Sequence, residues 1–336
     1  MSLNRKVVCN KLSSVFREAT EVLELPIPST LKPTELLVRN AFAGVNASDI
    51  NYTNGKYLPG VKPPFDCGFE GIGTVAGVGS AVKNIREGDH VVVQHFGTFS
   101  KYQVVPSRSA KVVPALKAGI LPLELSGCTA AIALGEVGKP QAGETALVTA
   151  AAGGTGQFAV QLLKKAGCKV AGTCSSDEKA AFLKSIGCDV VINYKNEDVD
   201  AVLAQHFPTG VNIVYESVGG SMLETALRSV ARKGRVITIG SITGYQDGTS
   251  FAAPKPSTVN IPTALLQKSA TLRGFFLPHY GKYSARYFEE LYAMYESGAI
   301  TSHVDATPFE SLDKTADAVE YLHSGRNIGK VVVATE

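Results

Sequence analysis

The stretch TALVTAAAGGTGQFAVQLLKKAG, residues 145–167, constrains the fold of this 336-residue chain more than any other. An apolar run typical of a strand leads to three glycines, Gly153, Gly154 and Gly156, and then to an amphipathic helix that begins near Gln157. Glycines let the backbone turn tightly, and a helix N-terminus offers free N–H groups with a partial positive charge. The order strand, loop, helix therefore predicts a pyrophosphate-binding loop in an α/β sheet.

The flanking segments extend this pattern. Apolar runs such as CKVAGTC, DVVINY, VNIVYESV, GRVITIG and ATLRGFF alternate with helical segments such as SDEKAAFLKSIG and SMLETALRSVARKG, which is typical of βαβ units in a parallel sheet. The first third is instead rich in short β-branched runs punctuated by Gly, Pro and Asn. We expect a β-rich domain at 1–122, a Rossmann-like doubly wound domain at 123–278, and a return at 279–336 that packs on the first domain. A ligand would lie in the cleft between two such domains.

Composition excludes several classes of protein. The net charge of +3 is spread along the chain, which argues against nucleic acid and anionic membranes as partners. No run of about 18 apolar residues predicts a membrane span, and the N-terminus has no signal-peptide pattern. Six cysteines without a C-x-x-C pair favour reduced thiols. We expect a cytoplasmic protein, and a peroxisomal or mitochondrial location stays open.

The residues after the second strand of the α/β region indicate which dinucleotide binds. NAD sites place an acid there to hold the ribose 2′-hydroxyl, but this strand ends in TCSS, and Asp177 and Glu178 fall in the first turn of the next helix. Hydroxyls at Ser175 and Ser176 and the cation of Lys179 suit a 2′-phosphate, which an acid would repel. The sequence therefore favours NADP(H).

The same test argues against a metal. His90 and His95 are an odd number of residues apart, so on one strand they would point to opposite faces, and no other histidines have metal-ligand spacing. Cys67 and Glu70 in CGFEG lack a third partner nearby. We therefore expect Cys67 to be a buried small hydrophobic residue and Glu70 to be a structural acid in preference to a catalytic one.

Several motifs in order, GVNASDINYTNGKY, GFEGIGTV, REGDHVV, AAAGGTG, GCDVVINY, YESVGG and GFFL, resemble the medium-chain dehydrogenase/reductases across essentially the whole chain. Within that superfamily the chain resembles the zinc-free branch, and most closely the prostaglandin reductase group, also called zinc-binding alcohol dehydrogenase domain-containing proteins. The resemblance implies a GroES-like β-rich catalytic domain beside the Rossmann domain. Zinc-dependent relatives have G-H-E where this chain has Phe69 before Glu70, which agrees with the absence of metal ligands.

The resemblance also implies cofactor contacts at particular positions. Thr155, Gly156 and Gln157 would lie at the pyrophosphate, and Ser175, Lys179 and Tyr194 at the 2′-phosphate. The nicotinamide half would meet Ser217, Ile239, Tyr245, the backbone of Phe275, Phe276 and Leu277, and Asn327 from the C-terminal return. Ser217 departs from the Asn common in quinone reductases, which weakens assignment to that branch.

Without a metal, reduction of a simple ketone is difficult, whereas an α,β-unsaturated ketone can accept hydride at its β-carbon while hydrogen-bond donors stabilise the enolate oxygen. Candidate donors are Tyr52, Tyr57, Asn51 and Tyr245, because a tyrosine hydroxyl stays protonated at neutral pH. Each tyrosine could instead serve packing alone. Aromatic residues in FFLPHY favour a hydrophobic substrate, and the family suggests an oxidised lipid such as a 15-keto-prostaglandin.

Three hypotheses stay open. The first is an NADPH-dependent reductase of α,β-unsaturated ketones and aldehydes, the second is an NADPH:quinone oxidoreductase, and the third is an NADPH-binding structural or regulatory protein with little turnover. By analogy with the family we also expect a homodimer whose Rossmann sheets join at an edge strand, either ATLRGFF or GRVITIG.

Overall fold

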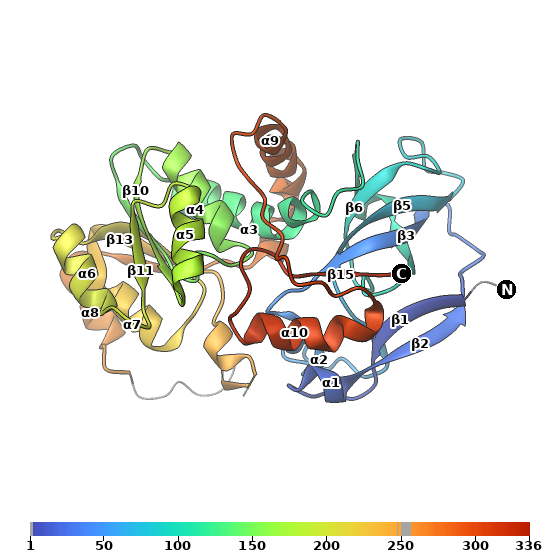
Figure 1. Ribbon diagram of the computed structural model, residues 1–336, viewed down its shortest axis with the longest axis horizontal. Coiled ribbons are helices and arrows are strands. Elements are labelled where there is room, and N and C mark those ends of the chain that lie inside the picture. Colours follow the sequence, from blue (N-terminus) through green and yellow to red (C-terminus); the bar gives the residue numbers. More distant parts are fainter. Residues whose placement is uncertain (1–2, 247, 250–256) are drawn as a thin grey trace. The chain divides into compact units, whose positions relative to one another are not determined.

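A computed structural model describes residues 3–246, 248–249 and 257–336. The chain forms two compact units: Met1–Leu125 together with Val304–Glu336, and Ser126–His303. In Figure 1 the first unit carries the blue and cyan segments and the red C-terminal ones, and the second carries the green to orange segments. The expected fold class, a parallel α/β sheet domain together with a β-rich domain, is confirmed.

The first unit is mainly antiparallel β structure. Its strands and helices are β1 (Leu3–Cys9), α1 (Phe16–Ala19), β2 (Thr20–Pro26), β3 (Glu35–Gly44), α2 (Asp49–Thr53), β4 (Phe65–Asp66), β5 (Glu70–Val78), β6 (His90–Gln94), β7 (Tyr102–Pro106), β8 (Ala110–Val113), α10 (Thr315–His323) and β15 (Val332–Ala334). One sheet has the order β2-β1-β4, and a larger one has the order β15-β3-β5-β6-β8, with β7 also paired to β3. The last strand of the chain therefore completes a sheet that begins near its start.

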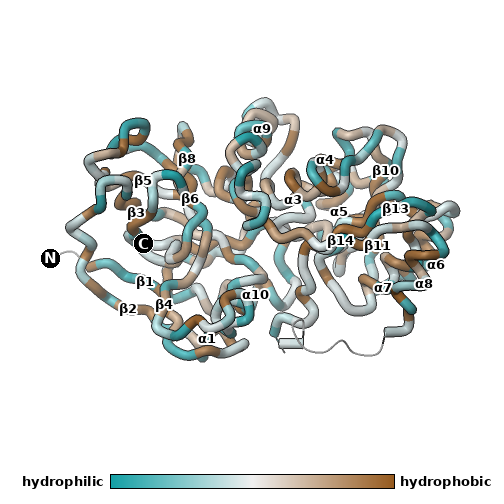
Figure 2. Tube along the Cα trace, turned by 180° about the vertical axis from the view of Figure 1, so that it is seen from behind, coloured by the Kyte–Doolittle hydropathy of each residue, from teal (hydrophilic) through white to brown (hydrophobic). Residues whose placement is uncertain are grey.

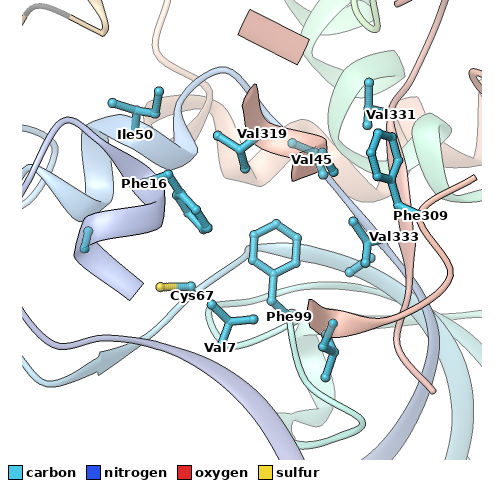
Figure 3. Close-up of a cluster of buried hydrophobic side chains, with 14 of the residues drawn as sticks. Val7, Phe16, Val45, Ile50, Cys67, Phe99, Phe309, Val319, Val331 and Val333 are labelled. Carbon is cyan, nitrogen blue, oxygen red and sulfur yellow. The ribbon is translucent and has the colours of Figure 1, made fainter. Parts of the chain in front are cut away.

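One core of the first unit gathers side chains from distant parts of the sequence (Figure 3). Phe99 is fully buried and packs edge-on against Phe16 with ring centroids 6.3 Å apart. Val331 and Val333 join it from the C-terminal segment, and Cys67 from the CGFEG stretch. The small, buried Cys67 thus serves packing, as expected.

The second unit is a six-stranded sheet whose recorded strand pairings are all parallel, in the order β11-β10-β9-β12-β13-β14. Its strands and helices are α3 (Cys128–Ile132), β9 (Thr145–Val148), α4 (Gly156–Lys165), β10 (Lys169–Cys174), α5 (Asp177–Ser185), β11 (Val190–Asn193), α6 (Val199–His206), β12 (Val211–Glu216), α7 (Gly220–Ser229), β13 (Val230–Thr238), α8 (Ile261–Lys268), β14 (Thr271–Gly274) and α9 (Ser284–Glu296). The chain order doubles back at β9, between β10 and β12, so the loop after β9 lies at the switch point of the sheet, where such folds bind ligands.

Two boundaries differ from the sequence expectation. The helix expected over SMLETALRSVARKG ends at Ser229, because Val230 already pairs with Val211 in the sheet. Residues 279–303 cluster with the second unit. Within it the Tyr287 hydroxyl of α9 donates a hydrogen bond to Glu136 at 2.8 Å, which helps to hold this helix.

Helices such as α4 and α7 are amphipathic, and the tube in Figure 2 carries both brown and teal residues. Among the described residues, no helix combines the length and the apolar character that crossing a membrane requires. All six cysteines are buried, and none of them forms a disulfide, which is compatible with the expectation of reduced thiols.

Candidate functional site

The glycine-rich loop has the close backbone packing that the sequence predicts. A Cβ atom on Gly156 would lie 2.4 Å from the carbonyl oxygen of Ala150, so only glycine fits where α4 begins. The side chain of Thr155, the residue before the helix, makes no capping hydrogen bond. Two N–H groups, of Ala150 and Ala151, donate to the hydroxyl and carbonyl oxygens of Thr173 at 3.2 and 3.0 Å, which ties the loop to β10. This helix N-terminus fits a pyrophosphate.

Gln157 lies in this loop but serves the protein. Its side chain exchanges two hydrogen bonds with the backbone of His303, at 3.0 and 2.8 Å, and its own N–H donates to Gly153 at 3.2 Å. Gly153 and Gly154 complete the turn between β9 and α4. Among the predicted loop residues, Thr155 and Gly156 therefore remain the better candidates for direct contact with a phosphate.

Two predicted residues for the 2′-phosphate lie side by side. Cys174 of β10 pairs with Asn193 of β11, and the N–H of Tyr194 donates to the carbonyl oxygen of Cys174 at 3.0 Å. Ser175 and Tyr194 follow these paired residues directly, so they emerge together at the carboxyl edge of the sheet. Tyr194 is 43% exposed, so its ring is accessible to a ligand, and the ammonium of Lys195 lies 5.7 Å from the ring centroid.

Lys179 lies in the first turn of α5, next to the same edge. The hydroxyl of Ser176 caps this helix by accepting from the N–H of Lys179 at 3.3 Å. The carboxylate of Asp177 accepts a hydrogen bond from Asn193 at 3.0 Å, so the acid is held by the protein. Hydroxyls, one lysine and an acid already paired to the protein suit a phosphate better than a sugar hydroxyl.

The turn after β12 is held by a buried acid. The carboxylate of Glu216 accepts the N–H groups of Val218 and Gly219 at 2.8 and 2.9 Å, and burial raises its pKa. Next to it, the N–H of Ser217 donates to Thr149 at 2.8 Å. The hydroxyl of Ser217 is buried without a hydrogen-bond partner. Buried hydroxyls are nearly always paired, so this orphaned group fits the predicted contact with the cofactor.

The other predicted cofactor residues of this unit follow β13 and β14. Ile239 comes directly after β13, and its N–H donates to Glu216 at 2.7 Å. Tyr245 is 6% exposed, and its hydroxyl accepts the N–H of Ser241 at 3.1 Å. Phe275 is buried, whereas Phe276 is 41% exposed.

Two more predicted residues complete the set. Leu277 begins a 3₁₀ helix, Leu277–Tyr283, directly after Phe276. Asn327 belongs to the first unit, where it is buried and its amide donates to Gly329 at 2.9 Å.

In the first unit, two of the predicted catalytic residues belong to an aromatic cluster. The ring of Tyr52 lies 4.7 Å from Phe96, 4.8 Å from Phe69 and 5.4 Å from Tyr57, measured between centroids. Phe69 precedes β5 and Phe96 follows β6, so two paired strands present them together. Burial, and then the nearby Asp49, raises the pKa of Tyr52, which keeps its hydroxyl a donor at neutral pH. We call Tyr52, Tyr57, Phe69 and Phe96 the aromatic cluster.

Asn51, the residue before Tyr52, is fully buried, and neither polar atom of its side-chain amide has a hydrogen-bond partner. Its backbone is ordinary, since its carbonyl oxygen accepts the N–H of Tyr57 at 2.9 Å. An unpaired buried amide costs about 1–3 kcal/mol, so proteins keep one where a ligand completes it.

Beneath this cluster is a buried ion pair that the sequence analysis missed. Glu70 is fully buried and pairs with Lys330, whose side chain is 3% exposed. Lys330 also donates to the side-chain oxygen of Asn46 at 2.6 Å, and the Asn46 amide donates to Glu70 at 2.9 Å. Glu70 is therefore a buried acid with partners within the protein, as expected of a structural acid. A signal for Lys330 was present: it is the one charged residue in the run IGKVVVAT.

Among the described residues, no group of three or more His, Cys, Asp or Glu side chains is arranged to hold a metal ion. The ammonium of Lys330 pairs with the carboxylate of Glu70, the residue that follows Phe69.

Comparison with known proteins agrees with this arrangement. Residues 32–134 match the alcohol dehydrogenase GroES-like domain, and residues 154–295 match the zinc-binding dehydrogenase family. The chain is 48% identical to a probable quinone oxidoreductase of Leishmania amazonensis, over 98% of this chain and 97% of that protein. It is 49% identical to prostaglandin reductase-3 of Mus musculus, over 98% of this chain and 89% of the relative. The Escherichia coli quinone oxidoreductase, solved with NADPH, superposes with a TM-score of 0.85 at 27% identity and covers 98% of this chain and 99% of its own.

The fold and these relatives define an oxidoreductase of the dehydrogenase class. More narrowly, the chain belongs to the medium-chain dehydrogenase/reductase superfamily, in its zinc-free group of quinone oxidoreductase-like proteins, which confirms the resemblance drawn from the motifs.

Proposed function

We propose that this protein is an NADPH-dependent reductase of α,β-unsaturated ketones and aldehydes, and that it acts without a metal. The second unit would bind the cofactor, and the first would supply the groups that meet the substrate. The similarity to a mouse prostaglandin reductase-3 favours hydrophobic, lipid-derived enones such as 15-keto-prostaglandins as substrates.

The observation that carries this proposal is the unpaired amide of Asn51 beside Tyr52. Two neutral hydrogen-bond donors, next to each other on α2, suit a carbonyl oxygen that gains negative charge as the double bond is reduced. Neutral donors are enough here, because the charge of an enolate is spread over the oxygen and the α-carbon. The rings of Phe69 and Phe96 fix the orientation of Tyr52 and offer an apolar surface to the substrate.

NADPH, when bound, supplies the hydride. The protein's share is to hold substrate and cofactor in a productive geometry, to keep water out, and to donate a proton to the α-carbon or the oxygen afterwards. We assign the hydrogen bond to the carbonyl oxygen to Tyr52 and Asn51. Tyr57 packs edge-on against Tyr52 and supports it, while Tyr245 is held to Ser241 in the turn that follows β13.

We assign cofactor contacts to residues that lie where a phosphate would bind, and to Ser217 because its buried hydroxyl has no hydrogen-bond partner. Thr155 and Gly156 would meet the pyrophosphate, Ser175, Lys179 and Tyr194 the 2′-phosphate, and Ser217 the nicotinamide half. Since β10 is followed by Ser175 and Ser176, and the first acid after them, Asp177, is held by Asn193, NADPH is preferred to NADH.

A quinone reductase is the second candidate, because the relative from Leishmania amazonensis carries that name. Flat quinones could lie against the same aromatic cluster. Ser217 in place of an Asn argues against this candidate.

The deciding experiment is NADPH oxidation by the purified protein with an enone and a quinone in parallel, with identification of the saturated ketone. Turnover of the enone with formation of the saturated product supports the proposal. Turnover of the quinone alone supports the second candidate, and turnover of neither, with NADPH still bound, indicates a binding protein.

We also propose a cytoplasmic homodimer. Six buried cysteines with no disulfide among them suit a reducing compartment, which cell fractionation can test. Of the two segments considered for the dimer, only that of β14 lies at the end of the sheet, since β13 is enclosed between β12 and β14. A second copy pairing along β14 would cover this edge, to which no other strand of the described residues pairs.

A further inference from the structure

Lys330 is a nearly fully buried lysine to which the proposed reaction gives no task. Its side chain is 3% exposed, and its ammonium lies between the carboxylate of Glu70 and the side-chain oxygen of Asn46. An ammonium group loses much hydration on burial, so it is kept only where paired groups replace the water. A charge pair this deep needs an explanation beyond filling space, because apolar residues fill space at lower cost.

Asn46 connects this pair to the helix that carries the proposed donors. Its side-chain oxygen accepts from Lys330, and its amide donates to Glu70 at 2.9 Å. Its backbone N–H donates to the carboxyl group of Asp49 at 2.7 Å, and the N–H of Asp49 donates back to its carbonyl oxygen at 3.0 Å. Asp49 is the first residue of α2, so Asn46 is held from both its side chain and its backbone directly before that helix.

The residues packed around Asn46 and Glu70 restrict how far these two side chains can move. A Cβ atom on Gly44 would lie 2.6 Å from the carboxylate of Glu70, so the chain passes the acid at a distance that only glycine allows. On the other side, His323 of α10 interacts with the backbone of Ala47, which precedes Asp49. Burial raises the pKa of Asp49 to about 8, which favours its uncharged form near neutral pH and leaves Lys330 and Glu70 as the oppositely charged pair.

We propose that Lys330 is a positioning residue for the reduction of the substrate: through Asn46, its ammonium fixes the start of α2 and thereby the orientation of Tyr52 and Asn51. In this protein the buried ammonium orders the groups around Glu70. This inference rests on the proposed function for its kinetic consequence, but its structural consequence can be measured without any substrate.

The test separates positioning from charge balance. Lys330→Met alone leaves Glu70 unpaired and buried, and this variant is expected to lose stability whatever the role of the lysine. In the double variant Lys330→Met with Glu70→Gln, both charges are gone and the glutamine can still accept the Asn46 amide, but Asn46 has lost the ammonium. The matched control, Lys32→Met with Glu35→Gln, removes a charge pair whose lysine is 81% exposed in the same unit.

The double variant, the control and the wild type are compared by two readouts. Thermal stability and NADPH affinity are also measured for each protein. Hydrogen exchange of residues 45–58 reports on the order of α2, and kcat and KM for an enone report on the donors. We expect the double variant to regain most of the stability that Lys330→Met loses and to bind NADPH unchanged. We expect its segment 45–58 to exchange about tenfold faster than in the control, and its kcat to fall about tenfold with a smaller change in KM.

Exchange of segment 45–58 at the wild-type rate in a stable double variant would overturn the proposal, and so would an unchanged kcat. If the wild type itself turns over no enone, the proposed function fails, and the exchange rates alone then decide whether Lys330 orders α2. The two failures are therefore distinguishable.

Discussion

Asp49 is a carboxyl group with almost no access to water, since it is 2% exposed. Burial raises its pKa from 3.8 to about 8, against smaller opposing effects from the N–H of Asn46 and the charge of Lys330. Glu70 raises it further by repulsion. The other titratable groups that sense Asp49 are Tyr52 and Cys67, whose own pKa values it raises. One residue thus links the charge state of the buried cluster to the stability of the fold.

This link gives a pH dependence with a definite sign. Between about pH 4 and pH 8 folded Asp49 keeps its proton while unfolded Asp49 loses it, so the free energy of unfolding falls as pH rises through this window and levels off above it. Asp49→Asn removes this titration, and the new amide oxygen can still accept the N–H of Asn46. Urea unfolding at both pH values should show that the difference in free energy of unfolding between the variant and the wild type increases by at least about 1 kcal/mol from pH 5 to pH 8.

His323 titrates in part of the same range, because burial lowers its pKa to about 4. The contribution of His323 to the free energy of unfolding is lost as the pH falls below about 6.5. It is the same in the wild type and in Asp49→Asn, so it cancels when the two free energies are subtracted. Parallel stability curves for wild type and variant would show that Asp49 is ionised in the folded state.

We expect Lys179 to favour NADPH over NADH. Lys179→Ala should raise the KM for NADPH about tenfold or more and leave the KM for NADH nearly unchanged, because only NADPH carries the 2′-phosphate that a lysine would hold. The exposed Lys184, in the last turn of the same helix, provides the control variant Lys184→Ala. Equal losses with both cofactors would place the 2′-phosphate elsewhere.

At the scale of elements, the pairing of β5 with β6 sets the aromatic cluster. Glu70 pairs with Gln94, so Phe69 before β5 and Phe96 after β6 emerge at the same end of the hairpin. Their rings lie 6.0 Å apart, and Phe96 remains 41% exposed. The hairpin therefore presents an apolar surface beside Tyr52 that a large substrate can cover.

Phe96→Ala should consequently discriminate between substrates by size. We expect kcat/KM for a phenyl-substituted enone to fall about tenfold, because the variant loses apolar contact and ring packing, while kcat/KM for methyl vinyl ketone changes by less than about threefold. Val112→Ala, on the 50% exposed Val112 of β8, is the control. Steady-state kinetics with both enones make the comparison, and equal losses for the two would indicate a general disturbance of the unit.

For the molecule as a whole, the sequence predicted what depends on local patterns. The spacing of glycines and the apolar runs were enough to predict the loop before α4 and the parallel sheet, because both depend on residues that are close together in the sequence. The partner of Glu70 could not be found this way, because Lys330 is 260 positions away and meets Glu70 only through the return of the C-terminal strand to β3. The early end of α7 was missed for a similar reason: pairing with β12 overrides the helical pattern after Ser229.

Among the described residues, the parallel sheet ends at β14. β14 is a four-residue strand at the end of the sheet, with its residues exposed or only partly buried, and an unpaired edge invites another strand. A two-fold pairing of β14 with its copy would give a continuous sheet across two chains. Sedimentation velocity at micromolar concentration should therefore give twice the 35.4 kDa mass of one chain. Alternate amides of β14 point toward β13 and are paired within one chain. Hydrogen exchange should show that the remaining amides of residues 271–274 are also slow and become faster on dilution, because only association would protect them. A monomer at this concentration, or fast exchange of these outward amides at every concentration, would contradict the pairing of two chains along β14.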